Sequence, residues 1–219
     1  MDEGKLSYCK GFSDHRNTFD VMVHFAEVCQ RFTNGEPILE IGTRQGGSAL
    51  ALMNIFKKRW FFTVDPYQEF YFENDDTVPG KGTKISMDLY RDAMALLAFE
   101  AKKLETNWTH YLMTDYDFMD ITRYVKISIK GKWYFSDDIK YSFVYLDGPH
   151  STEYVKNEIS YFKDKMVTGG CIVIDDCNNL DDIPKILSDC DISAMWYKQQ
   201  TEDKFLLCYD PSDKMVELL

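Results

Sequence analysis

The stretch Pro37-Ile-Leu-Glu-Ile-Gly-Thr-Arg-Gln-Gly-Gly-Ser-Ala-Leu50 decides the fold of this chain. It opens with a short apolar run, Ile38 to Ile41, which is typical of a strand although one acid, Glu40, interrupts it. Three glycines follow, and the segment 48–56 then reads as a helix. Strand, glycine turn and helix in this order open a nucleotide-binding α/β domain. The glycines let the backbone approach a ligand, and the helix start offers free N–H groups.

The remainder of the chain alternates between strand and helix patterns. Apolar, β-prone runs predict further strands at 60–64, 108–113, 141–146, 171–174, 192–197 and 204–209. Helical periodicity predicts helices at 17–32, 48–57, 86–104, 118–126, 152–166 and 182–188. We therefore expect an α/β fold, a Rossmann-like doubly wound sheet of seven strands with helices on both faces. The sheet should be mostly parallel, with one antiparallel edge strand contributed by the closely spaced last two strands.

The length of 219 residues suits a single domain over 1–219. Within it we expect an N-terminal arm and helix at 1–35 and a hairpin insertion at 127–138, where two β-prone runs flank a glycine. The segment 67–83 is both aromatic and acidic, and we expect it to be a lid loop over the substrate.

Charge and composition exclude several classes of partner. The chain carries 36 acidic against 25 basic residues, a net charge of -11, which disfavours nucleic acid. It has no apolar run near the ~20 residues of a membrane span, and its first residues do not resemble a signal peptide. The six cysteines show no metal-binding spacing, so we expect reduced thiols in a cytoplasmic protein. A homo-oligomer stays open.

Acidic residues gather where the parallel strands are expected to end. Six acids and one imidazole stand there: Glu40, Asp65, Asp115, Asp147, Asp175, Asp176 and His150. Because the carboxyl ends of parallel strands meet at one edge, these side chains should converge where such sheets bind ligands. Like charges packed together cost free energy unless cations offset them, so this edge is expected to be a functional site.

The glycine turn distinguishes between candidate ligands. A dinucleotide fingerprint would place glycine where Arg44 stands, and Glu40 just before the turn is a poor neighbour for a pyrophosphate. The pattern better suits a nucleoside ligand that carries positive charge. An acid at the end of the second strand, Asp65, stands where such folds hold ribose hydroxyls.

The segment Leu39–Gly47 resembles the first motif of the class I methyltransferases that use S-adenosylmethionine, and Asp65 matches their ribose acid. The segments 143–155 and 169–176 resemble the type 24 small-molecule O-methyltransferases, relatives of the metal-dependent catechol and caffeoyl-CoA enzymes. The resemblance covers about residues 36–180. It implies that the methyl donor is bound by Glu40, Gly42, Thr43, Arg44, Gly46, Ser48, Asp65, Asp115, Tyr116 and Asp147. Glu40 and Gly42 would contact its methionine part, and Asp115 with Tyr116 its adenine edge.

The same resemblance implies a divalent cation, Mg²⁺ by its preference for oxygen, held by Asp147, Asp175 and Asp176. The cation would hold a small-molecule hydroxyl in line with the sulfonium and lower its pKa. His150 and Asp147 would be the catalytic residues, with His150 taking the proton. His150 stands where the catechol enzymes have a lysine base, and Asp176 where they have an amide ligand.

Other interpretations stay open beside this one. The glycines could form only a tight turn, Asp175 and Asp176 could cap a helix, and His150 and Asp115 could be turn residues. An NAD(P)-dependent oxidoreductase is the second hypothesis, and a non-catalytic cofactor-binding module the third. Within the first hypothesis, nitrogen or carbon acceptors are not excluded.

Overall fold

The computed structural model of the chain describes residues 20–67, 87–122, 124, 126–129, 132–148, 151–177, 183–199 and 204–219. Its strands are β1 (Ile38–Ile41), β2 (Trp60–Val64), β3 (Asn107–Tyr111), β4 (Lys126–Ile129), β5 (Lys132–Phe135), β6 (Tyr141–Leu146), β7 (Met166–Ile174), β8 (Met195–Gln199) and β9 (Lys204–Cys208). Its helices are α2 (Asp20–Phe32), α3 (Gly47–Ile55), α4 (Met87–Lys103), α5 (Asp115–Ile121), α6 (Thr152–Phe162), α7 (Ile183–Asp189) and α8 (Asp213–Val216), with short 3-10 turns η1 (Ser136–Asp138) and η2 (Lys163–Lys165).

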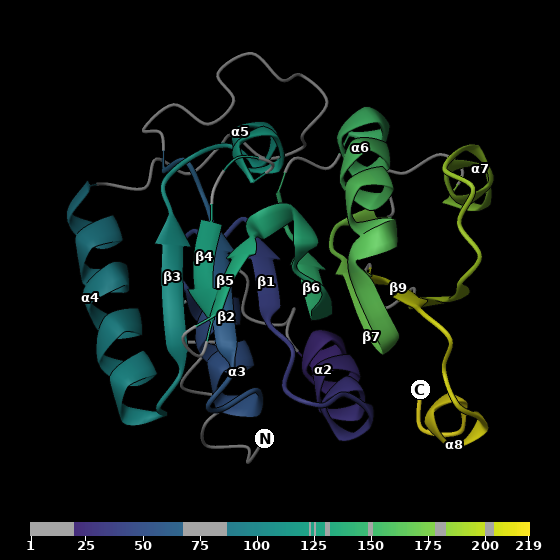
Figure 1. Ribbon diagram of the computed structural model, residues 1–219, viewed down its shortest axis with the longest axis horizontal. Helices are drawn as coiled ribbons and strands as arrows, with labels where there is room; N and C mark the ends of the chain where they lie inside the picture. Colours follow the sequence, from purple (N-terminus) through teal and green to yellow (C-terminus); the bar gives the residue numbers. More distant parts are fainter. Residues whose placement is uncertain are drawn as a thin grey trace.

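The main sheet has seven strands in the order β3-β2-β1-β6-β7-β9-β8, which confirms the predicted fold class. The first five strands of this order are parallel to one another. Strand β9 pairs antiparallel with both β7 and β8, so the strand that runs against the others lies one position inside the edge. Figure 1 shows α4 beyond β3 at one end of the sheet, and α7 and α8 at the other.

The alternation of side chains along each strand divides the core into two layers. One layer packs α2, α3 and α4 against residues such as Ile38, Phe143 and Val173. The opposite layer packs α5, α6 and α7 against Leu39 and its neighbours on the other face. Burying one large apolar side chain of this kind contributes about 1.5–3 kcal/mol, so the two layers hold the sheet rigidly beneath whatever binds at its edge.

Several helices and strands begin or end at other residues than the sequence predicts. Helix α5 begins and ends earlier than the predicted 118–126, because the Thr114 hydroxyl accepts a hydrogen bond from the backbone N–H of Asp117 and caps the helix there. Strand β7 begins at Met166, well before the predicted 171, and strand β8 begins at Met195. The C-terminal helix α8 was not predicted; Ser212 caps it.

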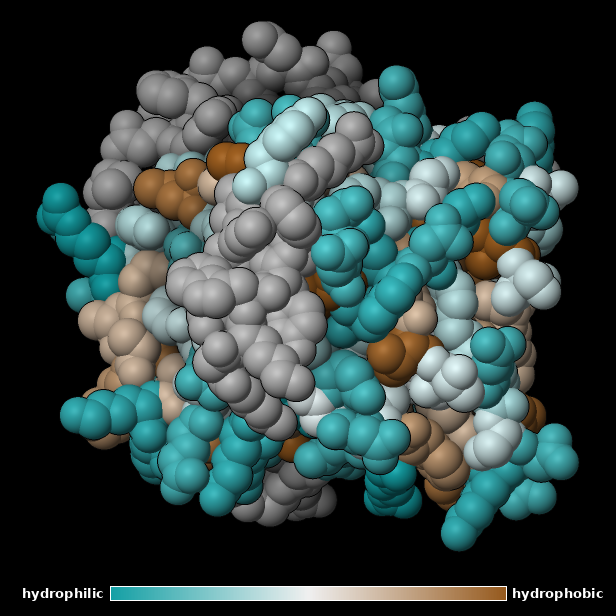
Figure 2. Space-filling view, viewed as in Figure 1, coloured by the Kyte–Doolittle hydropathy of each residue, from teal (hydrophilic) through white to brown (hydrophobic). Residues whose placement is uncertain are grey.

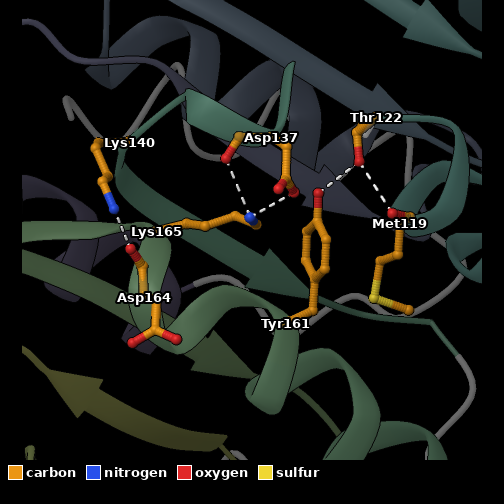
Figure 3. Close-up of polar contacts among 7 residues, drawn as sticks. All are labelled: Met119, Thr122, Asp137, Lys140, Tyr161, Asp164 and Lys165. Atoms are coloured by element: carbon orange, nitrogen blue, oxygen red, sulfur yellow. Dashed lines mark hydrogen bonds and ion pairs between the residues drawn. The ribbon is translucent and has the colours of Figure 1, made fainter. Parts of the chain in front are cut away.

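Strands β4 and β5 form a separate antiparallel pair, in the segment where the sequence predicts a hairpin insertion. The polar contacts of Figure 3 fasten the chain after this hairpin to the domain. Lys165 Nζ donates to the carboxylate of Asp137 (2.6 Å) and to its backbone carbonyl (3.1 Å). Beside it, the hydroxyls of Thr122 and Tyr161 lie 2.5 Å apart and join α5 to α6.

A second anchored cation lies where β2 and β6 begin. Arg59 belongs to the basic run 57–59, yet its side chain is buried beneath α2. Its guanidinium donates to the hydroxyls of Thr33 (3.0 Å) and Ser142 (3.1 Å) and lies over the ring of Phe56. The arginine therefore ties the end of α2 to the sheet.

Figure 2 shows one face on which hydrophobic residues are scattered rather than gathered into a large patch. In the described part of the chain, no helix is both long and apolar enough to cross a membrane. The five cysteines within it are buried and free.

Candidate active site

Four predicted site residues are aligned by the backbone at the carboxyl edge of the sheet. Gly42 N–H donates to the last carbonyl of β2 (2.9 Å), and Asp65 N–H donates to the last carbonyl of β3 (3.1 Å). Asp147 N–H donates to the last carbonyl of β1, and Asp175 N–H to that of β6, both at 2.9 Å. The structure thus brings these four residues side by side, in the order of their strands.

Gly42 sits where no other residue fits. Its φ is +89°, and a Cβ added there would lie 1.9 Å from the carbonyl oxygen of Asp147. The first turn of the glycine segment is therefore packed directly on the strand end that carries Asp147. At the start of α3, Gly46 also has a positive φ, and a Cβ there would press against Leu97.

Glu40 is a buried acid without a hydrogen-bond partner. It lies on the sheet face covered by α2 and α3 and is fully buried, yet neither carboxyl oxygen makes a hydrogen bond with the described residues. Burial raises the pKa of Glu40 to about 8, although the nearby hydroxyls of Ser48 and Thr43 oppose the rise. The Thr43 hydroxyl also lacks a hydrogen-bond partner in the described residues. Together these groups form a polar position that a ligand would satisfy.

Asp65 shapes the turn that follows β1. Its carboxylate accepts the backbone N–H of Arg44 (2.8 Å) and that of Tyr67 (2.7 Å). Burial raises the pKa of Asp65, and these two hydrogen bonds oppose that rise. Arg44 adopts a left-handed backbone conformation with φ 43°, and the Tyr67 hydroxyl donates to its carbonyl. Asp65 therefore holds the glycine turn in place as well as facing the site.

Asp115 and Tyr116 begin α5, beyond the end of β3. Asp115 is buried with one carboxyl oxygen lacking a hydrogen-bond partner in the described residues, whereas Tyr116 is exposed and its hydroxyl accepts from Asn157 (2.8 Å). A further buried acid, Glu158 of α6, lies close to both Asp115 and Gly148. Burial, and then the charge of Asp115, raise the pKa of Glu158 well above its usual range.

Sequence reasoning missed Glu158. A usable signal existed, because Glu158 interrupts the apolar stripe Val155, Ile159 and Phe162 of α6 at a position that must face inward. An acid on the buried face of a helix needs a partner or a function.

The far end of the site contains a lysine that the sequence analysis also missed. Lys204 begins β9, is fully buried, and donates to Oδ1 of Asp175. The hydroxyl of Tyr145, also buried, donates to Oδ2 of the same carboxylate. Asp147 is partly buried beside them; burial and the charge of Asp175 raise the pKa of Asp147, which Lys204 partly opposes.

The three predicted metal ligands differ in burial and in their hydrogen bonds. Asp176 is exposed and has a left-handed backbone with φ 45°, and its N–H donates to Asp175 Oδ1 (2.9 Å). Both oxygens of Asp175 are already engaged by hydrogen-bond donors. Among the described residues, no group of three acids, histidines or cysteines could hold a metal ion. This donor set does not fit the predicted divalent cation.

Two predicted parts of the site lie outside the described residues. They are His150, the predicted base, and nearly all of the predicted lid at 67–83.

With this geometry in view, the family is clear. Residues 39–177, more than half of the chain, match the type 24 family model described as a methyltransferase domain. The chain belongs to this methyltransferase family. No curated protein sequence matches this chain.

Solved structures of methyltransferases share its fold. The calicheamicin methyltransferase CalS11 is 15% identical, with a TM-score of 0.59, over 90% of this chain and 81% of its own. An O-methyltransferase from Bacillus cereus in complex with SAH is 13% identical, with a TM-score of 0.56, over 95% and 91%. The O-methyltransferase TomG of Streptomyces achromogenes, in complex with SAM, is 13% identical with a TM-score of 0.56, over 97% and 91%.

Proposed function

We propose that this protein transfers a methyl group from S-adenosylmethionine to a hydroxyl of a small molecule. The observation that carries the proposal is Glu40, a fully buried acid without a hydrogen-bond partner among the described residues, at the strand end beside Gly42. A buried carboxyl group that is left unsatisfied costs free energy, and a cationic ligand would recover it. The methionine part of S-adenosylmethionine carries an ammonium group and a sulfonium.

The other residues of the edge suit the remaining parts of this ligand. Asp65 would receive the ribose hydroxyls, and Asp115 with Tyr116 would meet the adenine edge. One oxygen of Asp115 has no hydrogen-bond partner within the described part of the chain and could accept there. Glu158 would complete that end of the site. The turn residues Thr43, Arg44, Gly46 and Ser48 would shape the backbone against the ligand, as predicted.

S-adenosylmethionine supplies, when bound, a methyl group on a positively charged sulfur. The contribution of the chain is to orient the acceptor and to keep the acids near that charge fixed. The rigid sheet edge does this through the backbone hydrogen bonds that align Gly42, Asp147 and Asp175. As the acceptor oxygen forms its new bond it must lose a proton, and His150 remains the predicted proton acceptor, with Asp147 beside the reacting groups.

An oxygen acceptor is favoured by the structural neighbours described as O-methyltransferases, although at this identity they show only the fold. No step is assigned to Mg²⁺, because the donor set at Asp147, Asp175 and Asp176 does not fit it. Membership of the methyltransferase family argues against the oxidoreductase hypothesis. A cytoplasmic location stays a prediction, and a homo-oligomer stays open.

Calorimetric titration with S-adenosylhomocysteine and, separately, with NAD⁺ tests the proposal. We expect S-adenosylhomocysteine to bind and NAD⁺ to give no heat of binding. Binding of NAD⁺ without S-adenosylhomocysteine would restore the oxidoreductase hypothesis. A screen of hydroxylated small molecules with a methyl-transfer assay would then separate an enzyme from a non-catalytic binding module.

Once an acceptor is found, His150→Gln tests the base. General-base catalysis typically contributes about 10²–10⁴-fold, so we expect kcat to fall by that factor with little change in the affinity for S-adenosylhomocysteine. An unchanged kcat would remove His150 from the mechanism.

A further inference from the structure

A buried lysine stands at the end of the sheet where the sequence predicts a metal. Strand β9 is antiparallel to β7, so it begins at the edge where the parallel strands end. Ile174 pairs with Phe205, and continuing this register places Lys204 opposite Asp175. The side chain of Lys204 is fully buried, donates to Oδ1 of Asp175 and lies 3.4 Å from the Tyr145 hydroxyl. The antiparallel strand therefore delivers a fixed positive charge into the acidic edge.

The ammonium of Lys204 offsets the negative charge of the acids at this edge, as a bound metal ion would otherwise do. Asp175 is buried, and the charges of Asp175, Asp176 and Glu40 all act on Asp147. Magnesium prefers near-octahedral coordination by oxygen at about 2.0–2.1 Å. Asp175 has no oxygen left without a donor, since Lys204 and the N–H of Asp176 share Oδ1 while Tyr145 occupies Oδ2.

We propose that the ammonium of Lys204 takes the place of the divalent cation, so that this site keeps its acids together without a metal. Because the charge is part of the chain, the site is complete at any concentration of divalent ions. Lys204 is then a positioning residue, which acts on the reaction through Asp175 and Asp147. Its effect on methyl transfer rests on the proposed function, whereas its exclusion of a metal is measurable by ion binding alone.

The first test compares Mn²⁺ binding to the wild-type protein and to Asp175→Asn by calorimetry, with Mn²⁺ as the only probe. An acidic protein binds some Mn²⁺ at its surface, and we expect the two isotherms to be the same. A single Mn²⁺ site in the wild type that Asp175→Asn abolishes would overturn the proposal.

The second test removes the ammonium with Lys204→Met, which keeps the length of the side chain. The freed acids should then bind Mn²⁺ at least about tenfold more tightly than the wild type does, because carboxylate ligands determine such affinity. The double variant Lys204→Met/Asp175→Asn should lose this gain. Lys198→Met, on the neighbouring strand β8 where the lysine is only half-buried, should bind Mn²⁺ as the wild type does.

A folded Lys204→Met that binds Mn²⁺ no better than the wild type would also contradict the proposal. If this variant does not fold, the comparison of wild type with Asp175→Asn still decides whether the native site takes a metal. Titrating each variant with S-adenosylhomocysteine separates the two proposals, since a protein that fails to bind it refutes the proposed function and leaves the Mn²⁺ result intact.

Discussion

Apart from the Lys204–Asp175 pair, the two ends of the sheet differ in how their buried charged groups are satisfied. At the amino ends of the parallel strands, Arg59 and Lys165 are buried, and each donates several hydrogen bonds. At the carboxyl ends, the carboxyl groups of Glu40, Asp115 and Glu158 each have oxygen atoms without a hydrogen-bond partner in the described residues. The unpartnered hydroxyls near the amino ends, on Thr106 and Tyr209, are neutral and less costly.

This difference separates structural charge from functional charge. Leaving a buried polar group unsatisfied costs about 1–3 kcal/mol, and more when it is charged. A protein keeps such groups only where something else recovers the cost, and under the proposed function a bound ligand would do so at the carboxyl ends. The amino ends, where the charges are satisfied internally, would be expected to govern stability alone.

The largest effect is expected at the amino ends, from Arg59→Met. The substitution leaves the buried hydroxyls of Thr33 and Ser142 without their donor, and we expect the free energy of unfolding to fall by about 3 kcal/mol. Chemical denaturation measures this. Lys58→Met is the matched control, because Lys58 forms an exposed ion pair with Glu105 at 3.2 Å, and losing it should cost under about 1 kcal/mol. A comparable loss in both variants would remove the special role of Arg59.

At the carboxyl ends, Glu40→Gln is expected to weaken ligand binding and to leave stability unchanged. The amide keeps the shape of Glu40 but has no proton to give up, so it cannot supply the negative charge that the ligand's ammonium would meet. We expect the affinity for S-adenosylhomocysteine to fall about 100-fold, near 2.7 kcal/mol, with no loss of stability. Calorimetry and denaturation on the same variant check both halves. Full affinity in Glu40→Gln would sink the assignment of this residue to the methionine part.

Stability should also depend on pH through Glu40. Its pKa in the folded protein is about 8, above its ordinary value of 4.5, so the folded state holds a proton that the unfolded chain releases between these values. The contribution is fully present below pH 4.5 and is lost as the pH rises toward 8, by at most about 1.4 kcal/mol per pH unit. Denaturation of ligand-free wild type and Glu40→Gln from pH 5 to pH 8 measures the difference. If the free energies of unfolding of the two proteins change with pH in parallel, the pKa of Glu40 is not raised in the folded protein.

The contrast between the two ends was only partly visible in the sequence. The strand runs and their closing acids predicted the sheet and the edge at which Glu40, Asp65, Asp147 and Asp175 meet, because parallel topology alone brings those positions together. Lys204 was not predicted as a site residue, because a lysine at the start of a strand gives no signal of function. Only the pairing of β9 with β7 places it opposite Asp175.

Residues that are adjacent in the sequence also differ in their burial. Asp175 and Asp176 were predicted to share a cation, yet the left-handed backbone of Asp176 leaves it exposed beside a buried partner. Arg59 and Lys58 are adjacent in one basic run, and only the packing of α2 distinguishes the buried arginine from the exposed lysine. Local sequence does not encode such differences, which arise from tertiary contacts.

The smallest effect is expected from Lys165→Met, the amino-end counterpart of Lys204→Met. Both lysines bind an aspartate, but Asp137 is 41% exposed and water can solvate it once the ammonium is gone, whereas Asp175 is 6% exposed. The ammonium of Lys165 lies 4.4 Å from the centroid of the Tyr161 ring. A methionine would keep an apolar contact over this ring. We expect a loss of about 1 kcal/mol in denaturation. Affinity for Mn²⁺ should not change, because water solvates the partly exposed carboxylate of Asp137. A gain in Mn²⁺ binding equal to that of Lys204→Met would mean that any buried lysine masks a metal site, and the distinction between the two ends would fail.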